Sequence, residues 1–165
     1  MGGTPFVCLQ PQYSLLARTI EAEILPTCAR HGLGVMTWSP LGSGLLTGRY
    51  KPADMQPDSR LGRLLASPVP MANKWAQDLL TERNLRIVEE ARRVAADLGT
   101  TTPAVALAWL SGRPGVTSVI LGPRTLRHLE ENLEALELKL PAELARRLDE
   151  ISSPSNDPVN GMSPA

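Results

Sequence analysis

The stretch Gly34–Gly44 combines residue types that suit a binding loop. A short apolar run ends at Trp38, and small or turn-forming residues follow it directly. Trp38 offers a flat aromatic face, serines offer hydroxyls, and glycines let backbone N–H groups approach an anion closely. The pattern indicates a phosphate-binding loop beside an aromatic ring, and an ordinary strand-to-loop turn is the alternative. The residues that would form this loop are Ser39, Leu41, Gly42, Ser43 and Gly44.

Two further residues add complementary chemistry. Gln10 carries an amide that both donates and accepts hydrogen bonds, as a carboxamide partner requires. Arg124 stands at the start of a predicted helix, where its guanidinium and the positive helix end both favour a phosphate. Amide, ring face, phosphate loop and arginine together describe a site for a nicotinamide dinucleotide with a 2′-phosphate. Taken singly, a tryptophan at a strand end is more often part of a core, so the combination carries the argument.

Three short apolar runs, 6–10, 35–38 and 116–121, predict the strands that must position these residues. Helical patterns separate the runs, and strands that alternate with helices predict an α/β fold with a parallel sheet. Each run is apolar on both faces, as strands covered by helices require. Ligand sites in such folds lie at the carboxyl ends of the strands, where Gln10, Trp38 and Arg124 all fall.

Residues 51–72 contain four prolines and no periodicity, which predicts a long loop, a lid or a disordered insert. The predicted helices are 20–30, with Thr19 as cap and a kink or late start at Pro26; 74–98, ended by Gly99; 103–110, capped by Thr102; 125–136, with Leu126, Leu129, Leu133 and Leu136 inward; and one from Pro141 that buries Leu144, Leu148 and Ile151.

The composition narrows the class of protein. The 165 residues suffice for one domain with a core, and 17 basic against 17 acidic side chains give no support for nucleic-acid binding. No apolar run is long enough for a membrane span, and the N-terminus lacks a signal-peptide pattern. Cys8 and Cys28 fit no metal-ligand spacing and no disulfide framework. We therefore expect a soluble cytoplasmic protein without a metal site.

Three motifs resemble the C-terminal half of the aldo-keto reductases, in the order found in that family. They are Gln10-Pro-Gln-Tyr-Ser-Leu-Leu, Trp38-Ser-Pro-Leu-Gly-Ser-Gly-Leu-Leu-Thr-Gly and Gly122-Pro-Arg-Thr-Leu-Arg-His-Leu-Glu-Glu-Asn. The resemblance runs from about Phe6 to Ile151. It implies a partial (β/α)8 TIM barrel, with the strands given above as its sixth, seventh and eighth.

The resemblance also implies a role for each matching residue. Gln10 would hold the nicotinamide carboxamide, and Trp38 would stack on the nicotinamide ring. Ser39, Leu41 and Ser43 would contact the pyrophosphate of NADP(H). The residues around the 2′-phosphate and ribose would be Gly122, Arg124 and His128, and those at the adenine edge would be Glu131 and Asn132. His128 departs from the Gln or Arg of the family pattern, and a solvated helix histidine is the alternative.

The resemblance also shows what the chain lacks. The Asp, Tyr, Lys and His that protonate the carbonyl oxygen in the resembling oxidoreductases belong to the absent N-terminal half. Tyr13 belongs to the strand-six motif and is not the catalytic tyrosine, so we assign no catalytic residue. Alternatives to a reductase half are a regulatory module that senses NADP(H) without turnover and an interaction scaffold. An intact enzyme would reduce aldehydes or ketones, and a keto-sugar is one candidate substrate.

A partial barrel leaves strand edges exposed, and we expect another protein surface to cover them. Two open parallel edges and an uncovered inner face favour association, so we expect a homo-oligomer or a complementing protein half. We divide the chain into the half-barrel, residues 1–152, and a flexible tail, residues 153–165.

Overall fold

A three-stranded parallel sheet forms the centre of the computed structural model, which describes residues 3–50 and 56–154. The strands lie in the order β1 (Cys8–Leu9), β2 (Gly34–Thr37) and β3 (Ser118–Val119). Cys8 lies opposite Gly34, and Met36 lies opposite Ser118. A separate parallel bridge between Gln12 and Trp38 continues the pairing beyond the carboxyl end of β1.

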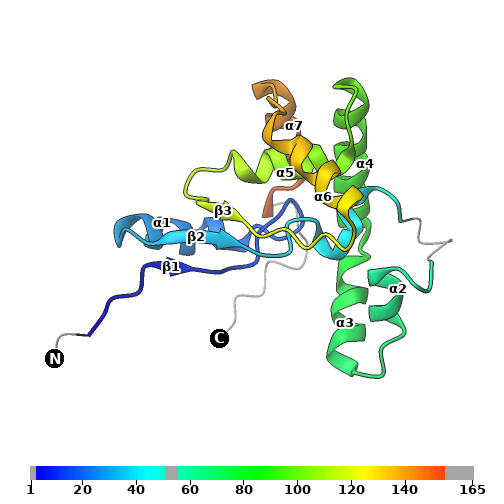
Figure 1. Cartoon of the computed structure of the whole chain (residues 1–165), viewed down its shortest axis with the longest axis horizontal. Helices are drawn as coiled ribbons and strands as arrows, with labels where there is room; N and C mark the ends of the chain where they lie inside the picture. The colour runs from blue at the N-terminus through cyan, green and yellow to red at the C-terminus, as the bar shows by residue number, and fades with distance from the viewer. Residues whose placement is uncertain (1–2, 51–55, 155–165) are drawn as a thin grey trace.

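The first strand is less buried than its sequence predicts. β2 is the central strand and buries Val35 and Thr37. The prediction of a fully buried strand over 6–10 is wrong, because only Cys8 and Leu9 pair and both are exposed. Phe6 is 90% exposed, since β1 is an edge strand and the chain before it runs away from the other described elements (Figure 1). Likewise, β3 covers only two residues of the predicted run 116–121.

Helices and turns lie beside the sheet and extend well beyond it, and no described helix covers the outer side of β1 in this view (Figure 1). In that view α5, α6 and α7 lie together above the strands, while α2 and α3 project past the lower end of α4. The bounds are η1 Thr19–Glu21, α1 Ile24–Arg30, η2 Gly42–Thr47, α2 Arg60–Leu65, α3 Pro70–Leu79, α4 Glu82–Asp97, α5 Thr102–Ser111, α6 Leu126–Leu133, η4 Glu134–Leu136 and α7 Ala142–Ile151.

The core lies where α4 packs against α5, α7 and η2. α5 is apolar all round, so nearly every one of its residues is buried, as predicted for this helix. Its cap is Thr101, whose side chain accepts from the N–H of Ala104; the prediction of Thr102 was one residue late. The largest core side chains come from loops, η2 and several helices: Tyr13, Leu15, Leu45, Leu46, Ile87, Leu110 and Leu148.

Two boundary predictions are wrong because capping overrides periodicity. Residues 51–72 are not a continuous loop, since α2 begins at Arg60 with the Ser59 side chain accepting from the N–H of Gly62. Residues 51–55 of that predicted loop lie outside the described part. The predicted helix 74–98 is two helices, α3 and α4, because Thr81 caps a new helix with a bond from the N–H of Asn84.

Near the N-terminus, the predicted helix 20–30 starts late, at Ile24, as Pro26 suggested, and Thr19 belongs to η1 instead of capping a helix. The helix 125–136 divides into α6 and η4, and its leucines do not all point inward. Leu126 and Leu136 are exposed by 70% and 73%, because no described element covers that face. Leu148 of α7 is fully buried, with Leu144 and Ile151 packed against the same core.

The end of the described chain is anchored. Ser152 is fully buried, and the carbonyl of Ser153 accepts a hydrogen bond from Arg83. The remainder of the predicted tail from residue 155 lies outside the described residues. None of the helices in the described ranges is long and apolar enough to cross a membrane.

Candidate functional site

A cavity of about 610 Å³ opens at the carboxyl ends of β2 and β3. Its volume falls within the ~300–1,000 Å³ typical of small-molecule sites. Every residue predicted from the sequence to bind the cofactor lines this cavity, except Gln10. Gln10 lies on an exposed strand end, and its role stays a prediction. The lining members of the predicted set are Trp38, Ser39, Leu41, Ser43, Gly122, Arg124, His128, Glu131 and Asn132.

The loop after β2 forms a tightly wound wall of the cavity. Ser39 has a φ of 56°, and Gly42, Ser43 and Gly44 follow with φ values of 52°, 55° and 93°. Two of these left-handed residues are serines, and such backbone costs about 1–2 kcal/mol outside glycine. Strain of this kind concentrates at functional sites.

Ser43 has a second unusual property. Its side chain is buried, and the Oγ atom has no hydrogen-bond partner among the described residues. A buried hydroxyl without a partner destabilises a fold, so it points to a ligand that would supply one. A pyrophosphate oxygen is an acceptor of the required kind, because a serine O–H can donate to it.

Trp38 is held through its backbone while part of its ring stays accessible. Its N–H donates to the carbonyl of Pro11 at 3.1 Å, and its carbonyl accepts from the N–H of Tyr13 at 3.3 Å. The residue is 38% exposed and lines the cavity. The ring can therefore offer a face to a flat ligand without moving the strand end.

Residues at and around the start of α6 form another wall of the cavity. Thr125 caps this helix, accepting from the N–H of His128 at 3.2 Å, and Arg124 precedes the cap as an exposed side chain. Asn132 is buried on the same helix and lines the cavity. The positive end of α6 and the guanidinium of Arg124 together favour an anionic group here.

Arg49 was not predicted from the sequence and joins two walls of the cavity. Its Nη2 donates to Glu131 at 2.9 Å, and its Nη1 lies 3.2 Å from Nε2 of His128. A hydrogen bond from Arg127 holds the pKa of Glu131 below its usual range, and the hydrogen bond from Arg49 lowers that pKa by a lesser amount.

Other lining residues were not predicted from the sequence either, and Tyr50, Arg60 and Trp75 are three of them. Arg49 and Tyr50 directly follow the glycine-rich motif, and that proximity was a usable signal. Arg60 begins α2 inside the segment interpreted as a loop or lid, and Trp75 lies on α3 inside the predicted helix 74–98, whose periodicity did not indicate contact with the strand ends. Within residues 3–50 and 56–154, no cluster of histidine, cysteine and acidic side chains is placed to hold a metal.

Comparisons with known proteins decide the family. The sequence matches the aldo/keto reductase family over residues 1–153. The chain belongs to this family. Aldo/keto reductases are (β/α)8 barrels that bind nicotinamide dinucleotides, and the three parallel strands with their helices agree with part of such a barrel.

Several curated proteins are similar to this aldo/keto reductase chain. A probable voltage-gated potassium channel subunit beta of Arabidopsis thaliana is 38% identical over 130 residues, which are 78% of this chain and 38% of that protein. The uncharacterized oxidoreductase YrpG of Bacillus subtilis is 36% identical over 142 residues, which are 86% of this chain and 39% of that protein. A putative voltage-gated potassium channel subunit beta of Schizosaccharomyces pombe is 35% identical over 145 residues, which are 86% of this chain and 41% of that protein. The chain thus spans about two fifths of the length of these relatives.

Proposed function

We propose that this chain is the NADP(H)-binding half of a carbonyl oxidoreductase. The buried, unpartnered Oγ of Ser43 on the cavity wall supports this most directly, because a pyrophosphate would satisfy it. Trp38 would stack on the nicotinamide, Ser39, Leu41 and Ser43 would hold the pyrophosphate, and Gln10 would bind the carboxamide. At the far end, Arg124, with Gly122 and His128, would take the 2′-phosphate, and Glu131 and Asn132 the adenine. NADP(H) supplies the hydride when bound.

We infer that the chain does not turn over substrate alone. Tyr13 is buried, and its phenol donates to Glu21 at 2.5 Å, so it cannot protonate a carbonyl in the cavity. Tyr50 lines the cavity, which makes it the residue to examine if reduction is seen. Substrates of a completed enzyme would be aldehydes or ketones, including keto-sugars.

A regulatory role is the second candidate, because two of the relatives above carry the name of a potassium channel subunit beta. Such a module, or a plain interaction scaffold, would use the same fold without catalysis. Binding without turnover even after complementation favours the regulatory role, and a folded chain that binds no dinucleotide favours the scaffold.

The exposed edges of the sheet support a partner. β1 and β3 each pair on one side only in the described sheet, and Phe6 and Val7 beside β1 are 90% and 72% exposed. Beside β3, a second cavity of about 280 Å³ is lined by Leu107, Val119, Leu133 and Leu136, among others. We propose that a complementing barrel half, or a second copy of this chain, covers these surfaces.

The test is a titration of purified, size-fractionated protein with NADPH, following the quenching of tryptophan emission, with NADH as control. Saturable quenching that prefers NADPH is the expected result. A folded protein that binds neither nucleotide contradicts the proposal. Mixing with the N-terminal half of a similar reductase should then restore some carbonyl reduction; turnover by the chain alone that Tyr50→Phe abolishes would overturn the inference of inactivity.

A further inference from the structure

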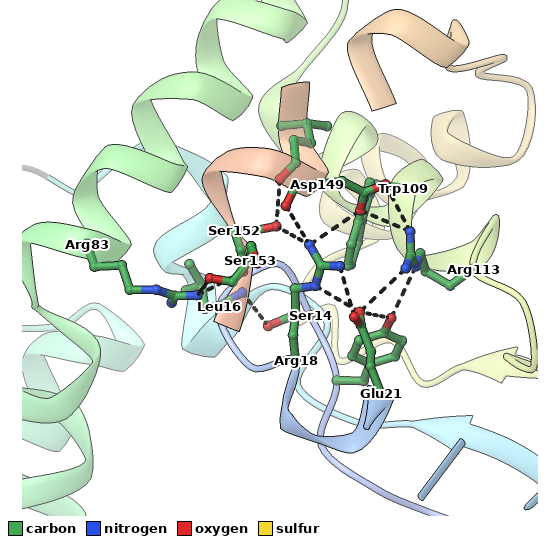
Figure 2. Close-up of polar contacts among 12 residues, drawn as sticks. Ser14, Leu16, Arg18, Glu21, Arg83, Trp109, Arg113, Asp149, Ser152 and Ser153 are labelled. Carbon is green, nitrogen blue, oxygen red and sulfur yellow. Dashed lines mark hydrogen bonds and ion pairs between the residues drawn. The ribbon is translucent and has the colours of Figure 1, made fainter. Parts of the chain in front are cut away.

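Six side chains from three distant parts of the sequence form one polar cluster, several of whose contacts are drawn in Figure 2. Arg113 donates to both carboxylate oxygens of Asp149, at 2.9 and 3.1 Å, and Trp109 Nε1 donates to the same carboxylate at 3.1 Å. The guanidiniums of Arg18 and Arg113 lie 5.2 and 5.0 Å from the centre of the Trp109 ring. We call this set the Trp109 cluster: Tyr13, Arg18, Glu21, Trp109, Arg113 and Asp149.

Tyr13 is the member of the Trp109 cluster whose backbone bonds to Trp38, a residue that lines the proposed cofactor cavity. Its ring packs edge-on against Trp109, with centroids 5.8 Å apart. Its hydroxyl donates to Glu21 at 2.5 Å and accepts from Arg113 Nε at 3.2 Å. Burial, followed by the hydrogen bond to Glu21, raises the pKa of Tyr13, so the phenol stays protonated and both bonds persist.

The backbone of Tyr13 connects this cluster to Trp38. The N–H of Tyr13 donates to the Trp38 carbonyl, and Trp38 in turn donates to Pro11, which makes the parallel bridge at Gln12. This bridge extends a strand pair that has only two residues in β1. The position of Trp38 therefore depends on the segment 11–13, and the buried side chain of Tyr13 anchors this segment.

We propose that the Trp109 cluster positions Trp38, through Tyr13, so that its ring presents a fixed face to the nicotinamide end of the dinucleotide. Tyr13 and Arg113 are then positioning residues. This inference rests on the proposed cofactor site. It separates the cavity into a nicotinamide end that the cluster controls and a 2′-phosphate end at Arg124 that it does not touch.

The test compares two probes, NADPH and 2′-phospho-ADP-ribose, which lacks the nicotinamide. Tyr13→Phe keeps the ring that packs on Trp109 and removes both hydroxyl bonds. It should weaken NADPH binding by up to about tenfold, because a Trp38 ring that is no longer held has to be ordered when the nicotinamide binds, and leave binding of the fragment unchanged. Arg113→Lys removes the bond to the Tyr13 hydroxyl and keeps the charge, so it should show the same pattern more weakly. Arg92→Lys, an exposed arginine paired with Glu89, is the matched control and should change neither.

The outcomes separate a positioning role from a structural one. Equal weakening of both probes, or no change in either, would overturn the proposal. As a second readout, the ¹⁹F line of Trp38 in 5-fluorotryptophan protein, assigned with Trp38→Phe, should move in Tyr13→Phe and in Arg113→Lys. If the wild-type chain binds neither probe, the proposed function fails. The ¹⁹F comparison then decides the positioning role alone, and an unmoved Trp38 line would refute it.

Discussion

Arg49 and Glu131 form an ion pair of 2.9 Å between segments 82 residues apart. Arg49 follows η2, on the side of the phosphate loop, and Glu131 lies on α6. Both line the cavity, so the pair links two walls that no described strand pairing joins directly. Glu131 also accepts from Arg127 at 2.8 Å within α6.

Arg49→Ala should speed the release of bound NADPH. Loss of the link lets the loop after η2 and α6 move apart, and one positive charge beside the cavity disappears. Exposed ion pairs contribute only about 0.2–1 kcal/mol, so the change in the dissociation rate should be a few-fold. Stopped-flow displacement of NADPH measures it. Arg127→Ala is the matched control, because it removes a Glu131 ion pair that does not cross the cavity; equal acceleration in both variants would contradict the linking role.

Arg124→Ala should weaken NADPH binding much more than NADH binding. The guanidinium lies at the start of α6, where a 2′-phosphate would be held by charge, and NADH lacks that phosphate. Removal of a charged hydrogen-bond partner costs about 1.5–3 kcal/mol, or roughly ten- to a hundredfold in affinity for NADPH. Titration calorimetry with both nucleotides checks this. An equal loss for both would place Arg124 away from the 2′-phosphate.

Ser43 should show opposite effects on stability and on binding. Ser43→Ala removes an unsatisfied buried hydroxyl and should stabilise the free protein by about 1 kcal/mol. Ser43→Gly should add roughly 1 kcal/mol more, because φ is 55° at this position. Both variants should bind NADPH more weakly. Urea unfolding and nucleotide titration measure the two effects. A less stable Ser43→Ala would show that the hydroxyl is satisfied in the free protein.

The sequence predicted the parallel pairing of the strands and nine of the residues that line the cavity, because the strand ends and the loops after them carry local signals. The apolar run before Ser39 and the glycines after it specify a strand end and a loop without reference to the rest of the chain. Helix α5 was predictable for the same reason, since a run that is apolar all round must be buried.

The failures all involve long-range packing or capping. Phe6, Leu126 and Leu136 are apolar, and sequence patterns place such residues inward, yet no described element covers them. The division at Thr81 and the start of α2 at Ser59 depend on single capping side chains that periodicity does not detect. The Arg49–Glu131 pair spans 82 positions and the Trp109 cluster about 130, so no window of sequence could reveal these contacts.

Glu21 should make the protein lose stability in acid. Burial acts to raise the pKa of Glu21, but hydrogen bonds from Arg18 and Tyr13 and the charges of Arg18 and Arg113 outweigh it, and the pKa is lowered. A carboxyl whose pKa is lower in the folded state stabilises the fold fully above its unfolded pKa of about 4.3, and this contribution is lost as the pH falls through the folded pKa.

Glu21→Gln should therefore lower the free energy of unfolding at pH 7 by about 1.5–3 kcal/mol and flatten its dependence on pH below the unfolded pKa. Urea unfolding of wild type and variant, from neutral pH down into the range where the folded carboxyl protonates, measures both. Glu143→Gln, on the exposed first turn of α7, should leave the acid profile in place. A Glu21→Gln profile parallel to that of the wild type would show that the carboxylate of Glu21 does not drive the acid transition, and an unchanged free energy of unfolding at pH 7 would show that its bonds to Arg18 and Tyr13 contribute little to the fold.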